Sequence, residues 1–229
     1  MITSKQNQKF KYWMRLKQKK YRDEYKRFLI YGEHQIEKAK ELNLIDEIIR
    51  EDIDISKDLM KDLQQTETSF SVIAVSEFPK LNVKTNKVLI LDDVQDPKNV
   101  GALIRSAAAF GFLEVYASFK TADYYNEKTI RAAKGSLFDV ALKRGNITDY
   151  IKTLKLDGYK IYGADAHEKN SVSVDHEKIA LVLGNEGRGL NDKTKALCNS
   201  FVNIKTENVE SLNVSIAGSI LMYLWSVKW

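Results

Sequence analysis

Short runs of apolar residues recur along the chain from residue 88 onward, and stretches with helical spacing separate them. The runs are Val88–Leu91, Leu113–Ala117, Val140–Leu142, Lys160–Gly163, Ile179–Leu183 and Phe201–Ile204. The helical stretches end at Phe110, cover Thr148–Leu156, begin at Asn191 and cover Leu212–Trp225. Strands that are apolar throughout are buried on both faces, and helices between such strands are typical of parallel sheets. The pattern therefore predicts an α/β fold with a mostly parallel sheet.

The preceding part of the chain has the pattern of a smaller α/β unit. Its segments are a basic helix to Arg27, a run Phe28–Tyr31, a helix His34–Leu42, a run Ile45–Ile49, a helix Lys57–Gln64 and a run Phe70–Val75. A polar stretch from Ser76 to Lys87 follows and contains one of the two prolines of the chain. Such a stretch is typical of a domain boundary. We expect two domains, residues 1–80 and residues 81–229.

The positive charge of the chain is concentrated at its start. The 229 residues carry a net charge of +5, but residues 1–28 hold ten basic and two acidic side chains, so this segment is +8 and the remainder −3. Aromatic residues alternate with these cations, a mixture suited to neutralising phosphates and stacking on bases. An amphipathic helix whose aromatic side chains pack on their own domain is the alternative. The candidate RNA contacts here are Lys11, Arg15, Lys19, Lys20 and Arg22.

Several classes of protein are disfavoured by what the sequence lacks. No stretch approaches the roughly 18 consecutive apolar residues of a membrane span, and the first 20 residues lack the apolar core of a signal peptide. We therefore expect a cytoplasmic protein that does not enter the membrane. Cys198 is the single cysteine and is expected to be a buried structural thiol. The three histidines, His34, His167 and His176, are scattered, so no metal site is expected.

The first polar motif follows the run Val88–Leu91 and extends from Asp92 to Gly111. Asp96 is expected to cap a helix whose first residue is Pro97. Asn99 then falls in the first turn, at the carboxyl end of a strand, where α/β sheets hold ligands. Arg105 lies about two turns further along the helix. A capping asparagine and a solvated arginine are the alternative interpretation.

The second motif is Gly184-Asn185-Glu186-Gly187-Arg188-Gly189, directly after a buried strand. Glycines let the backbone approach a ligand closely and expose N–H groups. The spacing is that of neither a P-loop nor a dinucleotide-binding turn. A plain turn remains an equal alternative for this motif alone.

The third motif, Asn208–Gly218, opens the terminal helix. Ser211 is a plausible N-cap, which would make the motif purely structural. Asn213 and Ser215, however, add polar groups to a helix that otherwise buries Val214, Ala217, Leu221 and Leu224. Buried polar groups need partners, so a role in a site is also open.

Together the motifs DxVxDPxNxGxxxRxAxxFG, LGNEGxG and VESLNVSxA resemble, in this order, those of the SpoU/TrmH family of RNA 2′-O-ribose methyltransferases of the SPOUT superfamily. The resemblance covers Lys87–Trp229 and includes Arg131–Phe138, a stretch similar to a family segment near the active site. Residues 10–75 are similar to the family's ribosomal-protein-like RNA-binding domain.

The resemblance implies a parallel-sheet methyltransferase domain with a C-terminal trefoil knot, S-adenosylmethionine bound in the knot, and a homodimer with its active site at the subunit interface. The small N-terminal α/β domain would bind RNA. The residues implied at the reacting ribose are Asn99, Arg105, Glu186, Ser211 and Asn213. Those implied around the cofactor are Leu183, Gly184, Asn185, Gly187, Ile204 and Leu212. Arg131 and Lys134 join the candidate RNA contacts.

One departure from the family pattern lies between Ile204 and Ser211, where members commonly carry a proline and about one more residue. The loop beside the adenosine is therefore expected to differ in shape. The implied function is methylation of a ribose 2′-hydroxyl, with ribosomal RNA of the 23S type favoured over tRNA by the basic N-terminal domain. A tRNA methyltransferase and an RNA-binding ribosome-assembly factor without catalysis are the alternatives.

Overall fold

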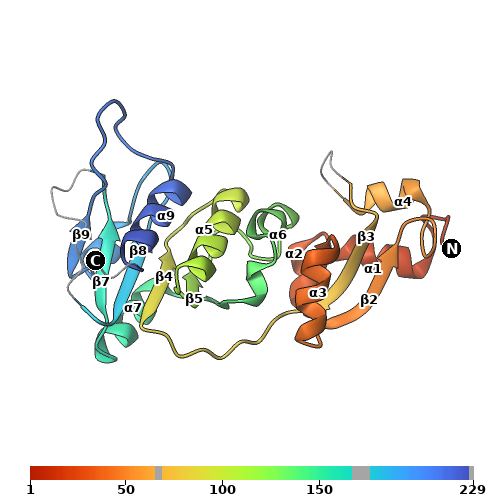
Figure 1. The fold of residues 1–229 in the computed structure, drawn as a ribbon, viewed down its shortest axis with the longest axis horizontal. Helices are drawn as coiled ribbons and strands as arrows, with labels where there is room; N and C mark the ends of the chain where they lie inside the picture. Colours follow the sequence, from red (N-terminus) through yellow and green to blue (C-terminus); the bar gives the residue numbers. More distant parts are fainter. Residues whose placement is uncertain (65–68, 167–175, 227–229) are drawn as a thin grey trace.

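The computed structural model describes residues 1–64, 69–166 and 176–226 of the chain. The chain forms two domains that lie end to end, with the N-terminus at the outer end of the first domain (Figure 1). The first domain contains an antiparallel sheet in the order β1-β3-β2. Its strands are β1 (Arg27–Tyr31), β2 (Ile45–Arg50) and β3 (Val72–Glu77). Its helices are α1 (Gln8–Arg15), α2 (Lys19–Tyr25), α3 (Glu33–Glu41) and α4 (Lys57–Asp62).

The prediction of one continuous basic helix up to Arg27 is wrong, because α1 and α2 are separate helices. Packing explains where α1 lies: the side chains of Phe10, Trp13 and Leu16 are buried in the core. The indole Nε1 of Trp13 also donates a hydrogen bond of 3.1 Å to Glu47. These aromatic residues therefore pack on their own domain, which is the alternative that the sequence left open for them.

The second domain is built on a parallel sheet in the order β6-β5-β4-β8-β7-β9. Its strands are β4 (Lys87–Leu91), β5 (Glu114–Ala117), β6 (Ala141–Arg144), β7 (Lys160–Ala164), β8 (Ile179–Leu183) and β9 (Ser200–Val202). The predicted parallel sheet is confirmed. The chain builds outward from β4 through β5 to β6, then crosses to the other side of β4 to form β7, and β8 fills the place between β4 and β7. Ligands of α/β proteins bind at such a switch in strand order, beyond the carboxyl ends of the strands.

Helices cover both faces of this sheet, as Figure 1 shows. On one face, α5 (Pro97–Ala109) and α9 (Val214–Leu224) pack against each other and over Leu89 and Leu91 of β4. On the other face, α7 (Ile147–Leu156) packs over Val88 and Ile90. Alternate residues of a strand point to opposite faces, so a fully apolar strand serves both helix layers.

The sequence analysis missed two short elements between β5 and β6, namely α6 (Glu127–Ala133) and the 3₁₀ helix η1 (Ser136–Phe138). Helix α6 contacts both α5 and β1, so it joins the two domains. Around it the ring of Tyr125 lies 4.6 Å from that of Phe28 and stacks at 3.9 Å on that of Phe78. The two domains therefore share a continuous apolar junction.

Within the described parts of the chain, no helix is long and apolar enough to cross a membrane. The remaining helix is α8 (Asp192–Lys195), which was predicted to begin at Asn191; it is capped by Asn191 and is only four residues long. The trefoil knot implied by the family resemblance stays a prediction.

Candidate functional site

The site begins where two neighbouring strands end. Strands β4 and β8 are paired so that Leu91 lies opposite Leu183, and the backbone N–H of Asp92 continues the ladder to the Leu183 carbonyl at 2.8 Å. The chain after β4 enters α5, and the chain after β8 forms the glycine-rich loop. Asp96 caps α5 by accepting from the Lys98 amide at 2.8 Å, with Pro97 as first helical residue, as predicted. The first two motifs therefore meet at the switch point of the sheet.

Residues from all three motifs form one hydrogen-bonded chain. The Asn99 amide Nδ2 donates to Glu186 Oε1 at 3.0 Å, and Asn213 Nδ2 donates to Asn99 Oδ1 at 3.1 Å. The Asn99 residue is 8% exposed, so these contacts satisfy a nearly buried amide. Both the carbonyl and the amino group of Asn99 are engaged, which fixes the orientation of its side chain. The structure thus brings Asn99, Glu186 and Asn213 together, as expected.

The Glu186 carboxylate lies at the N-terminus of α5. It accepts from the backbone N–H groups of Gln95 and Asp96, each at 3.3 Å, as well as from Asn99. Partial burial raises the pKa of Glu186, but the hydrogen bonds from Asn99 and from backbone amides outweigh it, so the net pKa is below its usual value. A negative charge at this position is also favoured by the helix dipole. Glu186 is therefore an ionised group that holds α5, Asn99 and the glycine-rich loop together.

The glycine-rich loop closes on itself. Asn185 and Gly189 exchange backbone hydrogen bonds of 3.0 and 2.9 Å. The Asn185 side chain accepts from the amides of Gly187 and Arg188. The expectation that the loop leaves its N–H groups exposed for a ligand is therefore wrong for these two amides. A Cβ on Gly184 would lie 2.4 Å from the carbonyl carbon of Gly189, so Gly184 is needed for the chain's own close approach.

The turn after β4 contains polar residues that the sequence analysis did not assign. Asp93 has a φ of 65°, and its carbonyl accepts from Asn185 Nδ2 at 3.0 Å. Its side chain accepts from Ser118 Oγ at 2.7 Å. Asp92 accepts from Asn191 at 2.8 Å, and burial raises its pKa. An unusual Asp-Asp pair at a strand end was the only signal in the sequence.

A cavity of about 490 Å³ lies beside this cluster. It is lined by all six predicted cofactor residues, Leu183, Gly184, Asn185, Gly187, Ile204 and Leu212. Glu186, Ser211 and Asn213 also line it, whereas Asn99 and Arg105 do not. Its volume falls within the roughly 300–1,000 Å³ of small-molecule sites. Apolar side chains such as Val202 and Ala217 suit an adenine, and carboxylates such as Glu210 and Glu186 suit a cationic sulfonium. The residues present therefore fit S-adenosylmethionine.

The third motif differs from expectation at its cap. Ser211 is not the N-cap of the terminal helix, because α9 begins at Val214 and is capped by Asn213. Asn213 Oδ1 accepts from the Ser215 amide at 2.9 Å, while its Nδ2 reaches Asn99. Ser211 is exposed, at the rim of the cavity. In the atypical loop before it, the Thr206 hydroxyl donates to the Val209 carbonyl at 2.6 Å.

Arg105 is the member of the predicted catalytic set that the structure leaves apart. It is exposed on α5, while the neighbouring Ile104 is buried against the sheet. It forms no hydrogen bond or ion pair with any other described residue. Six residues after Asn99, it is about 9 Å further along the helix axis. The fold of a single chain therefore does not bring this guanidinium to Glu186.

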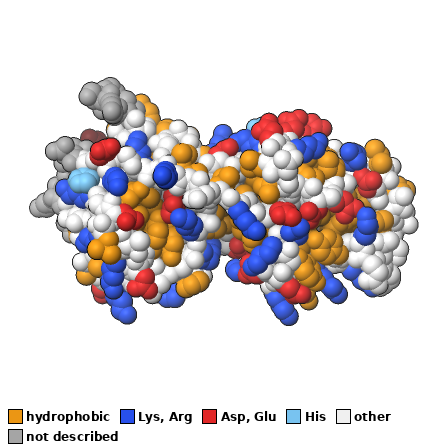
Figure 2. Space-filling model, turned by 90° about the horizontal axis from the view of Figure 1, so that it is seen from below, with side chains coloured by type: hydrophobic (Ala, Val, Ile, Leu, Met, Phe, Trp, Pro, Cys, Tyr) orange, Lys and Arg blue, Asp and Glu red, His pale blue; other side chains and the backbone are white. Residues whose placement is uncertain are grey.

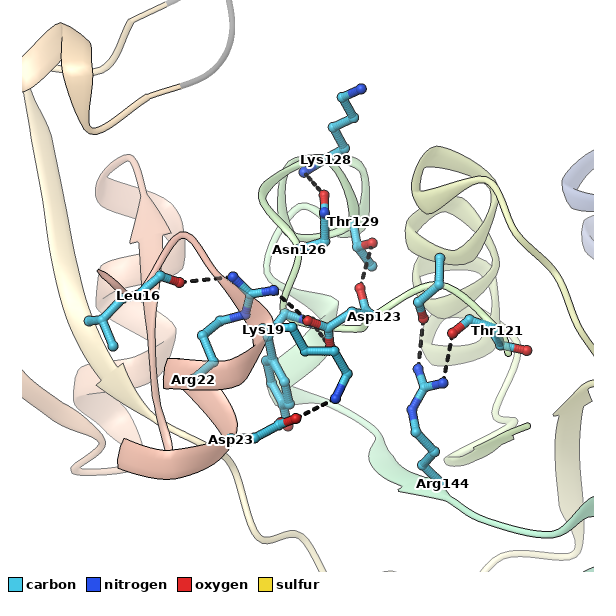
Figure 3. Close-up of polar contacts among 12 residues, drawn as sticks. Leu16, Lys19, Arg22, Asp23, Thr121, Asp123, Asn126, Lys128, Thr129 and Arg144 are labelled. Atoms are coloured by element: carbon cyan, nitrogen blue, oxygen red, sulfur yellow. Dashed lines mark hydrogen bonds and ion pairs between the residues drawn. The ribbon is translucent and has the colours of Figure 1, made fainter. Parts of the chain in front are cut away.

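Two of the predicted RNA contacts must be corrected, because their side chains are buried in the domain junction. Arg22 is 4% exposed; it pairs with Asp123 at 2.6 Å and donates to the Leu16 carbonyl at 2.8 Å (Figure 3). Arg131 lies over the rings of Tyr31 and Phe70, at 4.8 and 4.9 Å, and has a 15% exposed side chain. A positive residue is usually at the surface, but burial is possible where a partner compensates its charge.

The other predicted RNA contacts are accessible. Arg15, Lys19, Lys20 and Lys134 are exposed, and Lys11 is partly exposed. The face in Figure 2 carries Lys and Arg side chains over both domains, with Asp and Glu between them. Basic side chains near the surface are therefore not restricted to the N-terminal segment.

The prediction of a buried thiol at Cys198 holds only in part, because this residue has intermediate exposure. Burial raises the pKa of Cys198 to about 11, and its Sγ donates to the Thr194 carbonyl. His34 and His176 lie apart, and His167 lies outside the described residues. In the described parts of the chain, no three His, Cys, Asp or Glu side chains gather as a metal site would require.

The geometry defines an α/β protein with a cavity of small-molecule size at the switch point of a parallel sheet, beside an oriented Asn–Glu pair. Comparison with known proteins identifies the family. The model of the SpoU rRNA Methylase family matches residues 86–223, and that of the MRM3-like substrate binding domain matches residues 7–79. The chain belongs to the SpoU rRNA methylase family.

Relatives in this family align with most of the chain. The 23S rRNA (guanosine(2553)-2′-O)-methyltransferase RlmP of Bacillus subtilis is 37% identical, over 97% of each chain. The 23S rRNA (uridine(2479)-2′-O)-methyltransferase of Streptomyces viridochromogenes is 31% identical, over 86% of this chain and 74% of that one. The crystal structure of the SpoU methyltransferase AviRb from the same organism, in complex with AdoMet, is 24% identical. It superposes with a TM-score of 0.85 over 96% of this chain and 97% of that one.

Proposed function

We propose that this chain transfers a methyl group from S-adenosylmethionine to a ribose 2′-hydroxyl of ribosomal RNA of the 23S type. The observation that carries the proposal is the hydrogen-bonded chain Asn213–Asn99–Glu186 at the wall of a cavity of about 490 Å³. Relatives that align with most of the chain are named for this reaction on 23S rRNA. The first domain matches a substrate-binding family and would hold the RNA, while the second would hold the cofactor.

When bound, S-adenosylmethionine supplies a methyl group on a sulfonium, and the protein must align an oxygen lone pair with it. Positioning of this kind can account for much of the acceleration. Glu186 fixes Asn99, whose amide is held from both ends, so Asn99 can present a defined polar group to the ribose. Backbone and side chains of Leu183, Gly187 and Leu212 would hold the cofactor. Ser211, at the rim, would help to position the reacting groups.

We assign Arg105 the orientation of the hydroxyl and the adjacent phosphate by charge-assisted hydrogen bonds. A guanidinium is essentially always protonated, so Arg105 is a poor acceptor for the hydroxyl proton, which leaves to water instead. In a homodimer, Arg105 would act at a site completed by the second copy. The outer face of α9 exposes Ile216 (52%) and Tyr223 (46%), which suits such an interface. The protein would work in the cytoplasm, without a metal ion.

The test is transfer of labelled methyl from S-adenosylmethionine to purified RNA. We expect transfer to 23S rRNA lacking the modification, little transfer to tRNA, and none to the same sequence made as DNA, which has no 2′-hydroxyl. Label in tRNA but not in rRNA would contradict the assignment of substrate. Failure of the chain to bind S-adenosylmethionine in calorimetry would contradict the enzyme itself.

A further inference from the structure

A large aromatic side chain, Phe119, projects from the turn that follows β5. Phe119 is 75% exposed, and the neighbouring Lys120 has a 76% exposed side chain. A phenylalanine side chain is normally buried, so its exposure forgoes the gain that burial provides. A single exposed apolar residue needs no explanation by itself. The way in which the structure holds the turn that carries Phe119, however, does need an explanation.

The turn that carries Phe119 is anchored on both sides. Ser118 Oγ accepts from the Asp93 amide at 3.0 Å and from the Thr121 amide at 3.1 Å, and it donates to Asp93 Oδ1 at 2.7 Å. The Thr121 hydroxyl donates to the Leu91 carbonyl at 2.9 Å. Residues 118 and 121 are both buried while the two residues between them face solvent. The turn is therefore held by its ends and displays its middle.

Arg144 stabilises the same turn through hydrogen bonds to its backbone. Its guanidinium donates to the carbonyls of Ser118, Thr121 and Ala122 at 2.6, 2.7 and 2.7 Å, and it lies 4.9 Å from the Tyr124 ring. Figure 3 shows Arg144 directed at Thr121. A pre-ordered loop loses little conformational entropy when a ligand binds to it. The backbone that carries Phe119 is therefore held in place, and its exposed ring forms a pre-positioned platform.

This platform lies at the same edge of the sheet as the methyl-transfer site. Strand β5 is the neighbour of β4, and both turns follow the carboxyl ends of their strands. Ser118 bonds to Asp93, and Asp93 in turn accepts from Asn185, the residue before Glu186. Lys120 lies 3.6 Å from Asp93. An exposed aromatic ring, a cation and the candidate site thus share one continuous hydrogen-bonded edge.

We propose that Phe119 stacks against an unpaired base of the RNA substrate near the methylated nucleotide, while Lys120 meets a phosphate of the same strand. The inference rests on the proposed function. Proteins that recognise RNA bind bases displaced from helices by stacking them on aromatic rings. A ribose must leave a compact helix for its 2′-hydroxyl to reach the methyl group of a cofactor bound in the cavity, so the bases beside it lose their own stacking partners. Phe119 supplies a replacement.

The experiment compares Phe119→Ala, Phe119→Leu and Phe119→Trp on a 23S rRNA transcript, with Leu156→Ala as control. Leu156 is 88% exposed on α7, which covers the other face of the sheet. We expect Ala and Leu to weaken RNA binding and raise KM about 5- to 150-fold, the range for one stacked base. Trp is expected to restore both, and the calorimetric affinity for S-adenosylmethionine is expected to stay unchanged in all variants.

The contributions of Phe119 and Lys120 are distinguished by the salt dependence of RNA binding. Lys120→Gln should reduce the slope of log affinity against log salt by about 0.7–0.9, whereas Phe119→Ala should leave it unchanged. Wild-type affinity in Phe119→Leu would overturn the stacking role, because leucine keeps the apolar surface without a ring. A change in oligomeric state on light scattering would show instead that a second copy covers Phe119. Binding is measured without methyl donor, so loss of RNA binding in Phe119→Ala alongside an inactive wild type would refute only the proposed function.

Discussion

Replacing Arg22 by methionine tests whether this arginine ties the two domains together or binds RNA. The Arg22 guanidinium bonds to Asp123 at 2.6 Å, and their side chains are 5% and 16% exposed. The partner lies 101 residues away, in the second domain. Asp123 keeps a hydrogen bond of 3.2 Å from the Tyr125 amide but would lose its counter-ion. Methionine preserves much of the volume of the arginine stem, so the loss of charge dominates the change.

The magnitude follows from the burial of both partners. Removing one member of a buried ion pair costs about 3–5 kcal/mol, because the other charge stays buried and uncompensated. Replacing both partners by apolar residues is often neutral or stabilising. We therefore expect Arg22→Met to lower the free energy of unfolding by about 3 kcal/mol. The double variant Arg22→Met/Asp123→Leu should recover most of that loss.

The assay is urea unfolding followed by far-UV circular dichroism and by tryptophan fluorescence, since Trp13 lies in the first domain and Trp225 in the second. Exposed Lys20 supplies the control. Lys20→Met should change stability by less than about 0.5 kcal/mol. It should, however, lower the salt slope of RNA binding by about 0.7–0.9. A loss below 1 kcal/mol in Arg22→Met, or a double variant as unstable as the single one, would refute the reasoning.

Four further predictions concern the site and its surroundings. Glu186→Gln should lower kcat about 100-fold by loosening Asn99 while leaving RNA affinity unchanged; equal kcat would contradict the positioning role. Hydrogen bonds lower the pKa of Glu186 in the folded protein. The stability that this carboxylate adds is therefore present above its unfolded pKa and is lost as the pH falls through the lowered pKa of the folded state. Unfolding curves recorded between about pH 3 and about pH 7 can test this dependence. Gly184→Ala should open the loop at Gly189 and weaken cofactor binding in calorimetry, whereas unchanged affinity would show that the loop can adapt. Cys198, whose pKa burial raises to about 11, should resist alkylation at neutral pH, and rapid labelling of the native protein would contradict its burial.

The sequence predicted the sheet well because its strands are buried on both faces, which leaves a clear apolar run such as Ile179–Leu183. It missed α6 because that helix has only seven residues and buries polar Glu127 and Thr129 toward the domain junction. It joined α1 and α2 because neither proline nor glycine marks the break at Leu16–Gln18. Tertiary packing sets that break, and local spacing carries no signal for it.

The candidate site could be predicted only in part, because contacts between distant parts of the chain are set by the fold. The family resemblance implied that Asn99, Glu186 and Asn213 belong to one site, although 87 and 114 residues separate the bonded pairs. Charge composition assigned Arg22 to RNA, and similarity to a family segment assigned Arg131, because a cation's buried partner elsewhere in the chain is invisible to both. Phe119 was not singled out, since its exposure and the anchoring of its turn exist only in the folded chain.

The most direct measurement maps 2′-O-methyl groups in total RNA from cells with the gene, without it, and with Asn99→Ala in its place. The account predicts that one or a few 23S rRNA positions lose methylation without the gene, remain unmethylated with the variant, and regain it with the wild type. Unchanged 23S rRNA with a lost tRNA methyl group would contradict the proposed substrate. Full methylation by Asn99→Ala would contradict the site itself.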